Sequence, residues 1–113
     1  MKTLHLVLKK QWFDMIASGE KTEEYREIKP YWQKRICINC NELYCERPCL
    51  DCYRNDMNTF NHYDTVTFYL GYKKDRPKMT FKIRYISVGY GKEEWGAEKG
   101  KVYFVIKLGE RIN

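Results

Sequence analysis

A chain of 113 residues has room for one domain with one modest core. Hydrophobic residues make up 43% of it, near the globular average, so a core can form without disulfides. No apolar run approaches the roughly 20 residues of a membrane-spanning helix, and the stretch Leu4–Leu8 is too short for a secretory signal. We therefore expect a single domain, residues 1–113, in the cytoplasm, where thiols stay reduced, with no membrane contact.

The net charge of +6 is concentrated in one part of the chain. Between Gly71 and Lys92, seven basic residues stand against Asp75 alone, and seven minus one equals the excess of the whole chain. The seven are Lys73, Lys74, Arg76, Lys78, Lys82, Arg84 and Lys92. Such a segment is typical of phosphate binding, although a solvated face has the same composition. The aromatic share of 16% suits a small barrel and also a surface on which nucleobases stack.

The first third of the chain predicts two strands and two helices in alternation: strand Leu4–Leu8, helix Lys10–Ser18, strand Thr22–Ile28 and helix Tyr31–Ile36. Trp12, Met15 and Ile16 fall at helical spacing in the first helix, and Gly19 follows it where a left-handed residue ends helices. Pro30 opens the second helix, because proline is tolerated in a first turn.

The second half predicts three strands: Thr65–Leu70, a long strand beginning at Lys78, and a last strand from Val102 to Leu108. Alternation places Met79, Phe81, Ile83 and Tyr85 on one face of the long strand. Five strands and two short helices predict an α+β fold, a small and mostly antiparallel β-barrel with helical caps. Closure of the barrel would remove exposed strand edges.

The segment from Gly19 to Arg26 carries the strongest chemical signal. Glu24 and Arg26 are two apart on a strand and so share a face, and the preceding turn can bring Lys21 to the same face. An ammonium and a guanidinium beside a carboxylate hold the carboxylate ionised or grip a phosphate. The alternative is a surface strand with cross-strand ion pairs.

Gly19, Lys21, Glu24 and Arg26 fit the pattern G-x-K-x-x-E-x-R, which resembles the signature of the ASCH family. The resemblance covers about residues 1–36 and 64–108. It implies a barrel similar to the PUA domain, an RNA-binding module, with the motif residues lining a cleft. Some members remove the acetyl group from N-acetylated cytidine with a threonine three residues after the lysine. Here that position holds Glu24, which would act instead as a general base on water.

Residues 37–61 form an insertion that the resemblance does not cover. It contains two C-x-x-C pairs, Cys37 with Cys40 and Cys49 with Cys52, and a fifth cysteine, Cys45, between them. Four thiolates from two such pairs are the usual ligands of a tetrahedral structural zinc, although the gap between the pairs is short. We expect zinc here; reduced or disulfide-linked cysteines, or iron–sulfur chemistry, are the alternatives.

The expected function is binding of RNA or a nucleotide in a basic cleft. The candidate ligand-binding residues are Lys21, Glu24, Arg26, Tyr31, Trp32, Lys82 and Arg84. Tyr31 and Trp32 would stack on a base unless one belongs to the core, and Lys82 and Arg84 would meet phosphates. One alternative is a hydrolase acting on modified nucleosides, or a ribonuclease, with Lys21 and Glu24 as catalytic residues. Another is an adaptor that binds protein through the zinc knuckle.

Overall fold

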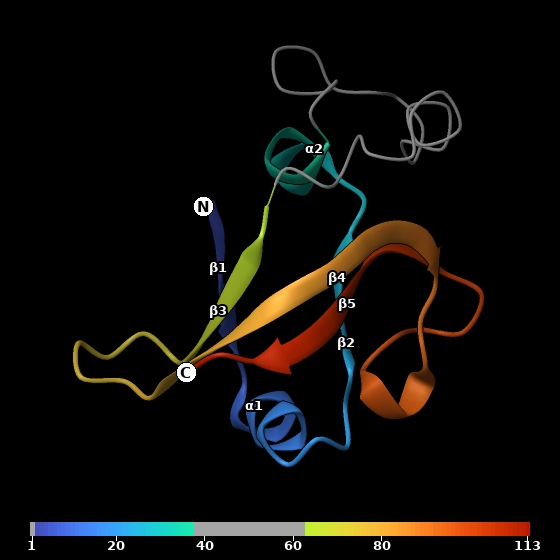
Figure 1. Ribbon diagram of the computed structural model, residues 1–113. Helices are drawn as coiled ribbons and strands as arrows, with labels where there is room; N and C mark the ends of the chain where they lie inside the picture. Colours follow the sequence, from blue (N-terminus) through green and yellow to red (C-terminus); the bar gives the residue numbers. More distant parts are fainter. Residues whose placement is uncertain (1, 38–62) are drawn as a thin grey trace.

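The computed structural model describes residues 2–37 and 63–113, which form five β-strands, two α-helices and a short 3₁₀ turn at Glu93–Trp95 (Figure 1). In chain order the strands and α-helices are β1 (Thr3–Leu8), α1 (Lys10–Ala17), β2 (Glu23–Glu27), α2 (Pro30–Ile36), β3 (Thr65–Leu70), β4 (Lys78–Tyr90) and β5 (Val102–Arg111). The elements expected from the sequence are confirmed; the predicted ends are identical or differ by one residue, except that β5 ends three residues later than expected. None of the helices in these two ranges is long and apolar enough to cross a membrane.

The five strands form one mixed sheet in the order β1-β3-β4-β5-β2. β1 and β3 are parallel, and the other three pairings are antiparallel, as the strand pattern predicted for most of the sheet. The sheet curls into a half-barrel (Figure 1). The expected full closure is wrong for the described strands, because β1 and β2 remain the two edges of the sheet.

The main core fills the concave side of the half-barrel. Its buried residues come from four strands and both helices: Leu4, Leu6, Leu8, Phe13, Ile16, Ile36, Cys37, Val66, Phe68, Met79, Phe81, Ile86, Phe104, Ile106 and Leu108. The helices lie toward opposite ends of the sheet (Figure 1), and each contributes an apolar residue to this cluster, so α1 and α2 cap its ends. A smaller cluster of Tyr25, Ala97, Tyr103 and Val105 covers the other face of β2 and β5.

The face assignment of β4 is correct only for its first half. Met79 and Phe81 are buried as predicted, but Tyr85 is 44% exposed and Ile86 is 1% exposed. The register with β5 shifts between Phe81 and Ile83 and again between Ile83 and Tyr85. An irregularity of this kind transfers the following residues to the opposite face. The prediction that Tyr85 shares a face with Met79 and Phe81 is therefore wrong, and Ile86 is buried in its place.

Candidate functional site

The turn between α1 and β2 positions the first residue of the motif. Gly19 adopts the left-handed conformation that the sequence predicted, with φ of 86°. The backbone N–H of Lys21 then donates to the carbonyl oxygen of Met15 at 3.0 Å, which ties Lys21 to the last turn of the helix. β2 begins two residues later, so the side chain of Lys21 enters the site from the helix end.

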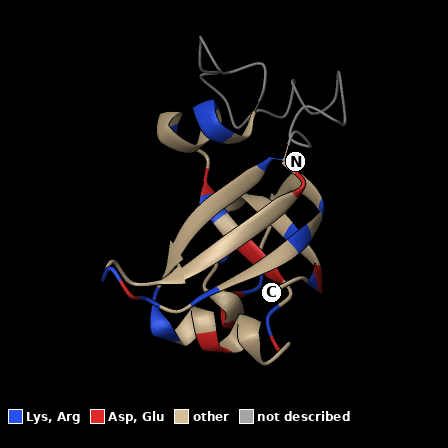
Figure 2. Cartoon of the chain, turned by 60° about the vertical axis from the view of Figure 1, so that its left-hand side comes forward, with Lys and Arg blue, Asp and Glu red and all other residues tan. Residues whose placement is uncertain are grey.

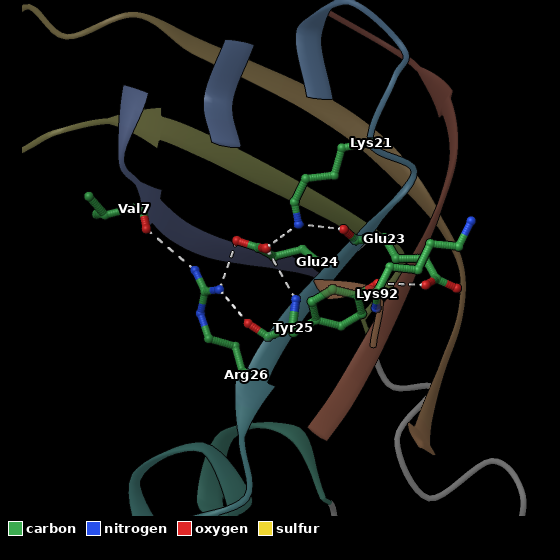
Figure 3. A network of polar contacts seen from close by, with 7 residues as sticks. All are labelled: Val7, Lys21, Glu23, Glu24, Tyr25, Arg26 and Lys92. Carbon is green, nitrogen blue, oxygen red and sulfur yellow. Dashed lines mark hydrogen bonds and ion pairs between the residues drawn. The ribbon is translucent and has the colours of Figure 1, made fainter. Parts of the chain in front are cut away.

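Glu24 is the centre of the polar network in Figure 3. Its Oε1 accepts hydrogen bonds from Nζ of Lys21 at 2.8 Å and from the backbone N–H of Tyr25 at 3.1 Å. Its Oε2 accepts from Nη1 of Arg26 at 2.8 Å. Nζ of Lys21 also donates to the carbonyl oxygen of Glu23 at 2.7 Å. The three charged groups that the sequence placed on one face therefore meet at one carboxylate.

The network is buried: Lys21 is 1% and Glu24 5% exposed. Burial alone would raise the pKa of Glu24, but the charges of Arg26 and Lys21 and their hydrogen bonds hold it below its usual value. Burial lowers the pKa of Lys21, and the charge of Glu24 offsets part of that effect. Two cations around one ionised carboxylate give the group a formal charge of +1.

Arg26 also links the two edges of the sheet. Its Nη2 donates to the carbonyl oxygen of Val7 on β1 at 3.4 Å, and its Nη1 donates to the carbonyl oxygen of Tyr25 at 2.7 Å. The guanidinium carbon lies 5.2 Å from the ring centroid of Trp32, a cation–π contact. Arg26 is therefore held by a carboxylate, two backbone carbonyls and an aromatic ring.

A cleft of about 830 Å³ opens beside this polar network, and residues of both edge strands, β1 and β2, line it. It is lined by His5, Leu6, Val7, Leu8, Lys9, Trp12, Glu24, Tyr25, Arg26, Glu27, Lys29, Tyr31, Trp32, Tyr72, Trp95, Gly96, Glu98 and Tyr103. Seven of these residues are tyrosines or tryptophans, of which Tyr25 and Tyr103 are buried and Tyr31 and Tyr72 are exposed. Three are basic and three acidic, so the lining itself is balanced in charge rather than basic.

The candidate residues from the sequence divide into three groups. Glu24, Arg26, Tyr31 and Trp32 line the cleft, and Tyr31 and Trp32 meet edge to face with ring centroids 4.8 Å apart. Lys21 lies beneath the cleft, with its side chain fully covered. Lys82 and Arg84 are exposed on β4 and are not among the lining residues, and Lys82 forms an ion pair with Glu110 at 2.8 Å.

One wall of the cleft belongs to the segment Lys92–Glu98, which contributes Trp95, Gly96 and Glu98 to the lining. Two tyrosine hydroxyls fasten it, because the backbone N–H of Lys92 donates to Oη of Tyr25 at 3.0 Å and that of Glu98 donates to Oη of Tyr103 at 2.9 Å. Oη of Tyr25 in turn donates to Oε1 of Glu23 at 2.9 Å (Figure 3). No local sequence pattern marks these tyrosines, because each lies on a strand and its hydroxyl contacts a backbone N–H in the segment between β4 and β5.

The predicted zinc site lies mostly outside the described residues. Cys40, Cys49 and Cys52 fall in 38–62, whereas Cys37 is fully buried in the main core just after α2. Within 2–37 and 63–113, no group of three or more His, Cys, Asp or Glu side chains is placed to hold a metal ion. Zinc at the cysteine pairs therefore stays a prediction.

In comparisons with known proteins, no family model matches the chain, and no curated protein matches it.

Proposed function

We propose that the protein binds single-stranded RNA, or a nucleotide unit of it, with a base held in the cleft beside Arg26. The observation that carries the proposal is the combination of seven aromatic rings with a fixed guanidinium in a cleft of about 830 Å³. Ligand sites are typically concave, of this size, and lined by aromatic side chains with a few placed polar groups. The resemblance to the ASCH family leads to the same function.

The cleft offers a nucleotide each kind of contact that it needs. The guanidinium carbon of Arg35 lies 3.7 Å from the ring centroid of Tyr31, and the half of Tyr31 that stays exposed is the area on which a base would stack. Lys9 and Lys29 at the lining provide ammonium groups for phosphate, and the carboxylates of Glu27 and Glu98 can accept hydrogen bonds from the amino groups of bases. Mixed charge together with ring faces suits a nucleotide better than a simple anion.

The state of Glu24 favours binding over hydrolysis. A general base works best with a pKa near the working pH, whereas Arg26 and Lys21 hold the pKa of Glu24 below its usual value. Both carboxylate oxygens already accept hydrogen bonds from those two cations. We therefore assign Glu24 to orienting its neighbours rather than to activating water.

The test is fluorescence anisotropy with a short, labelled single-stranded RNA of mixed sequence, comparing two tyrosine variants. Tyr31→Ala removes an exposed ring from the cleft and should weaken binding about tenfold, or ~1.4 kcal/mol, because stacking on one base contributes about that much. Tyr85→Ala removes a ring that is 44% exposed on β4 and does not line the cleft, so its affinity should equal that of the parent.

Equal affinities for the parent and both variants would remove the cleft from the binding site. Release of acetate from N-acetylated cytidine, or shortening of the RNA during incubation, would instead establish the hydrolase alternative.

A further inference from the structure

A second hollow, of about 430 Å³, lies on the loop between β3 and β4. Four of the residues that line it are basic and two are tyrosines: Lys73, Lys74, Arg76, Lys78, Tyr69 and Tyr72. Asp75 is the one acidic residue of this loop. Figure 2 colours the basic and acidic residues along the described chain. In contrast to the balanced lining of the cleft, this groove is strongly positive. We call it the loop groove.

One cation of the loop groove is already held in place. The guanidinium carbon of Arg76 lies 4.2 Å from the ring centroid of Tyr69, and its Nη1 donates to the carbonyl oxygen of Gly71 at 3.1 Å. Stacking of this kind fixes the plane of the guanidinium and reduces the entropy that a ligand contact costs. Lys73 and Lys74 are exposed beside it.

The loop groove adjoins the cleft. Tyr72 lines both hollows and is 85% exposed. A second connection is the hydrogen bond of 2.9 Å between Nδ1 of His5, which lines the cleft, and Oη of Tyr69, which lines the loop groove. A ligand that fills the cleft can therefore extend into the loop groove without leaving the surface.

We propose that the loop groove binds the phosphate backbone of the same RNA strand whose base occupies the cleft. The inference rests on the proposed function and deepens it, because it makes the ligand a polynucleotide rather than a free nucleotide. A cluster of cations beside an exposed tyrosine, here Tyr72, is typical of surfaces that follow single strands, in which cations meet phosphates and rings meet bases. An acidic peptide would use the cations but would leave the ring of Tyr72 without a stacking partner.

The experiment uses the full chain and two double variants from the same basic segment. Lys73→Gln with Lys74→Gln removes two charges from the loop groove, and Lys82→Gln with Arg84→Gln removes two charges from β4, outside both hollows. Binding is measured by anisotropy with the short single-stranded RNA at several salt concentrations. Binding of cytidine monophosphate is followed through tryptophan fluorescence.

We expect the loop variant to bind the RNA at least about tenfold more weakly. Its plot of log affinity against log salt should be flatter by about 1.4, since each phosphate contact on a single strand contributes about 0.7. Its affinity for cytidine monophosphate should not change. The β4 variant should behave as the parent with both probes.

Three results would overturn the inference while leaving the cleft as a site. They are equal loss of RNA affinity in both double variants, loss of cytidine monophosphate binding in the loop variant, and competition by polyglutamate as strong as by RNA. Failure of the proposed function itself has a different signature, because Tyr31→Ala would then leave the affinity for both RNA and cytidine monophosphate unchanged.

Discussion

Glu24 holds together two cations that would otherwise be buried close to each other. Lys21 and Arg26 each lie 2.8 Å from one of its oxygens, and Lys21 has no exposed side-chain area. Removal of one member of a buried ionic group costs more than its own contacts, because the remaining charges lose their partner. The carboxylate is therefore the member on which the stability of the group depends most.

We predict that Glu24→Gln lowers the free energy of unfolding by about 3 kcal/mol at pH 7, because it leaves two cations around a neutral amide. Lys21→Met should cost less, since Arg26 still neutralises the carboxylate. Urea denaturation measures both values. Asp14→Asn is the control: it breaks the exposed pair with Lys10 and should cost less than ~1 kcal/mol. Equal losses in Glu24→Gln and Asp14→Asn would show that the buried group is unimportant for stability.

The dependence of stability on pH should also distinguish the parent from Glu24→Gln. The pKa of Glu24 is lower in the folded chain than the ordinary glutamate value of 4.5, so the folded state binds a proton less readily than the unfolded state. Its contribution is therefore complete above pH 4.5 and is lost as the pH falls through the folded pKa. The stability of the parent should fall more steeply than that of Glu24→Gln between neutral pH and pH 3. Parallel curves would contradict this assignment.

At the scale of elements, the segment Lys92–Glu98 depends on close contact with the rest of the structure. Gly96 has φ of 101°, and a Cβ placed on it would lie 2.9 Å from the ring of Trp12. Gly100 also has a positive φ, of 78°, but a Cβ there would meet nothing within 4 Å. Alanine substitutions at the two glycines therefore measure separately how much stability is lost to the backbone conformation and how much to the contact with α1.

We predict that Gly100→Ala destabilises the protein by about 1 kcal/mol, the cost of a left-handed alanine. Gly96→Ala should cost at least ~1 kcal/mol more, because Trp12 or the segment must move in addition. Only Gly96→Ala should also weaken the proposed RNA binding and shift the tryptophan emission, since Trp12 and Gly96 both line the cleft. Thermal unfolding and fluorescence measure these effects, and indistinguishable variants would show that the contact with Trp12 contributes nothing.

At the scale of the whole molecule, the half-barrel leaves an open seam between its edge strands, and a side chain crosses it. β1 and β2 are at opposite ends of the strand order, yet Arg26 of β2 donates to the carbonyl oxygen of Val7 on β1. The cleft lies along the same seam, because residues of both strands line it. Incomplete closure of the sheet is therefore what creates the site.

We predict that Arg26→Met speeds amide hydrogen exchange in β1 and β2 by about tenfold, because it removes the charged donor that holds Glu24 and the carbonyl oxygens of Tyr25 and Val7, contacts together worth ~1.5 kcal/mol. Exchange in the β3–β4 pair should not change. Lys107→Met is the matched control, since Lys107 contacts Glu23 on the side where β2 is already paired with β5. Faster exchange in β1 for the control as well would assign the effect to general destabilisation of β2.

The sequence alone determined the elements and the local geometry of the motif. Periodicity of two or 3.6 residues places the strands and helices, because it depends only on near neighbours along the chain. Gly19 predicted the turn, and the spacing of Glu24 and Arg26 predicted their shared face. Both predictions depend on a few consecutive residues, so no distant partner was needed.

Only the tertiary structure decided which distant residues meet. The strand order brings His5 of β1 into the same cleft as Glu24 of β2, and the register shifts in β4 expose Tyr85. The tertiary structure also divides the basic segment, placing Lys73 in the loop groove and Lys82 against Glu110. Such contacts follow from the pairing and curvature of the whole sheet, which local periodicity does not specify.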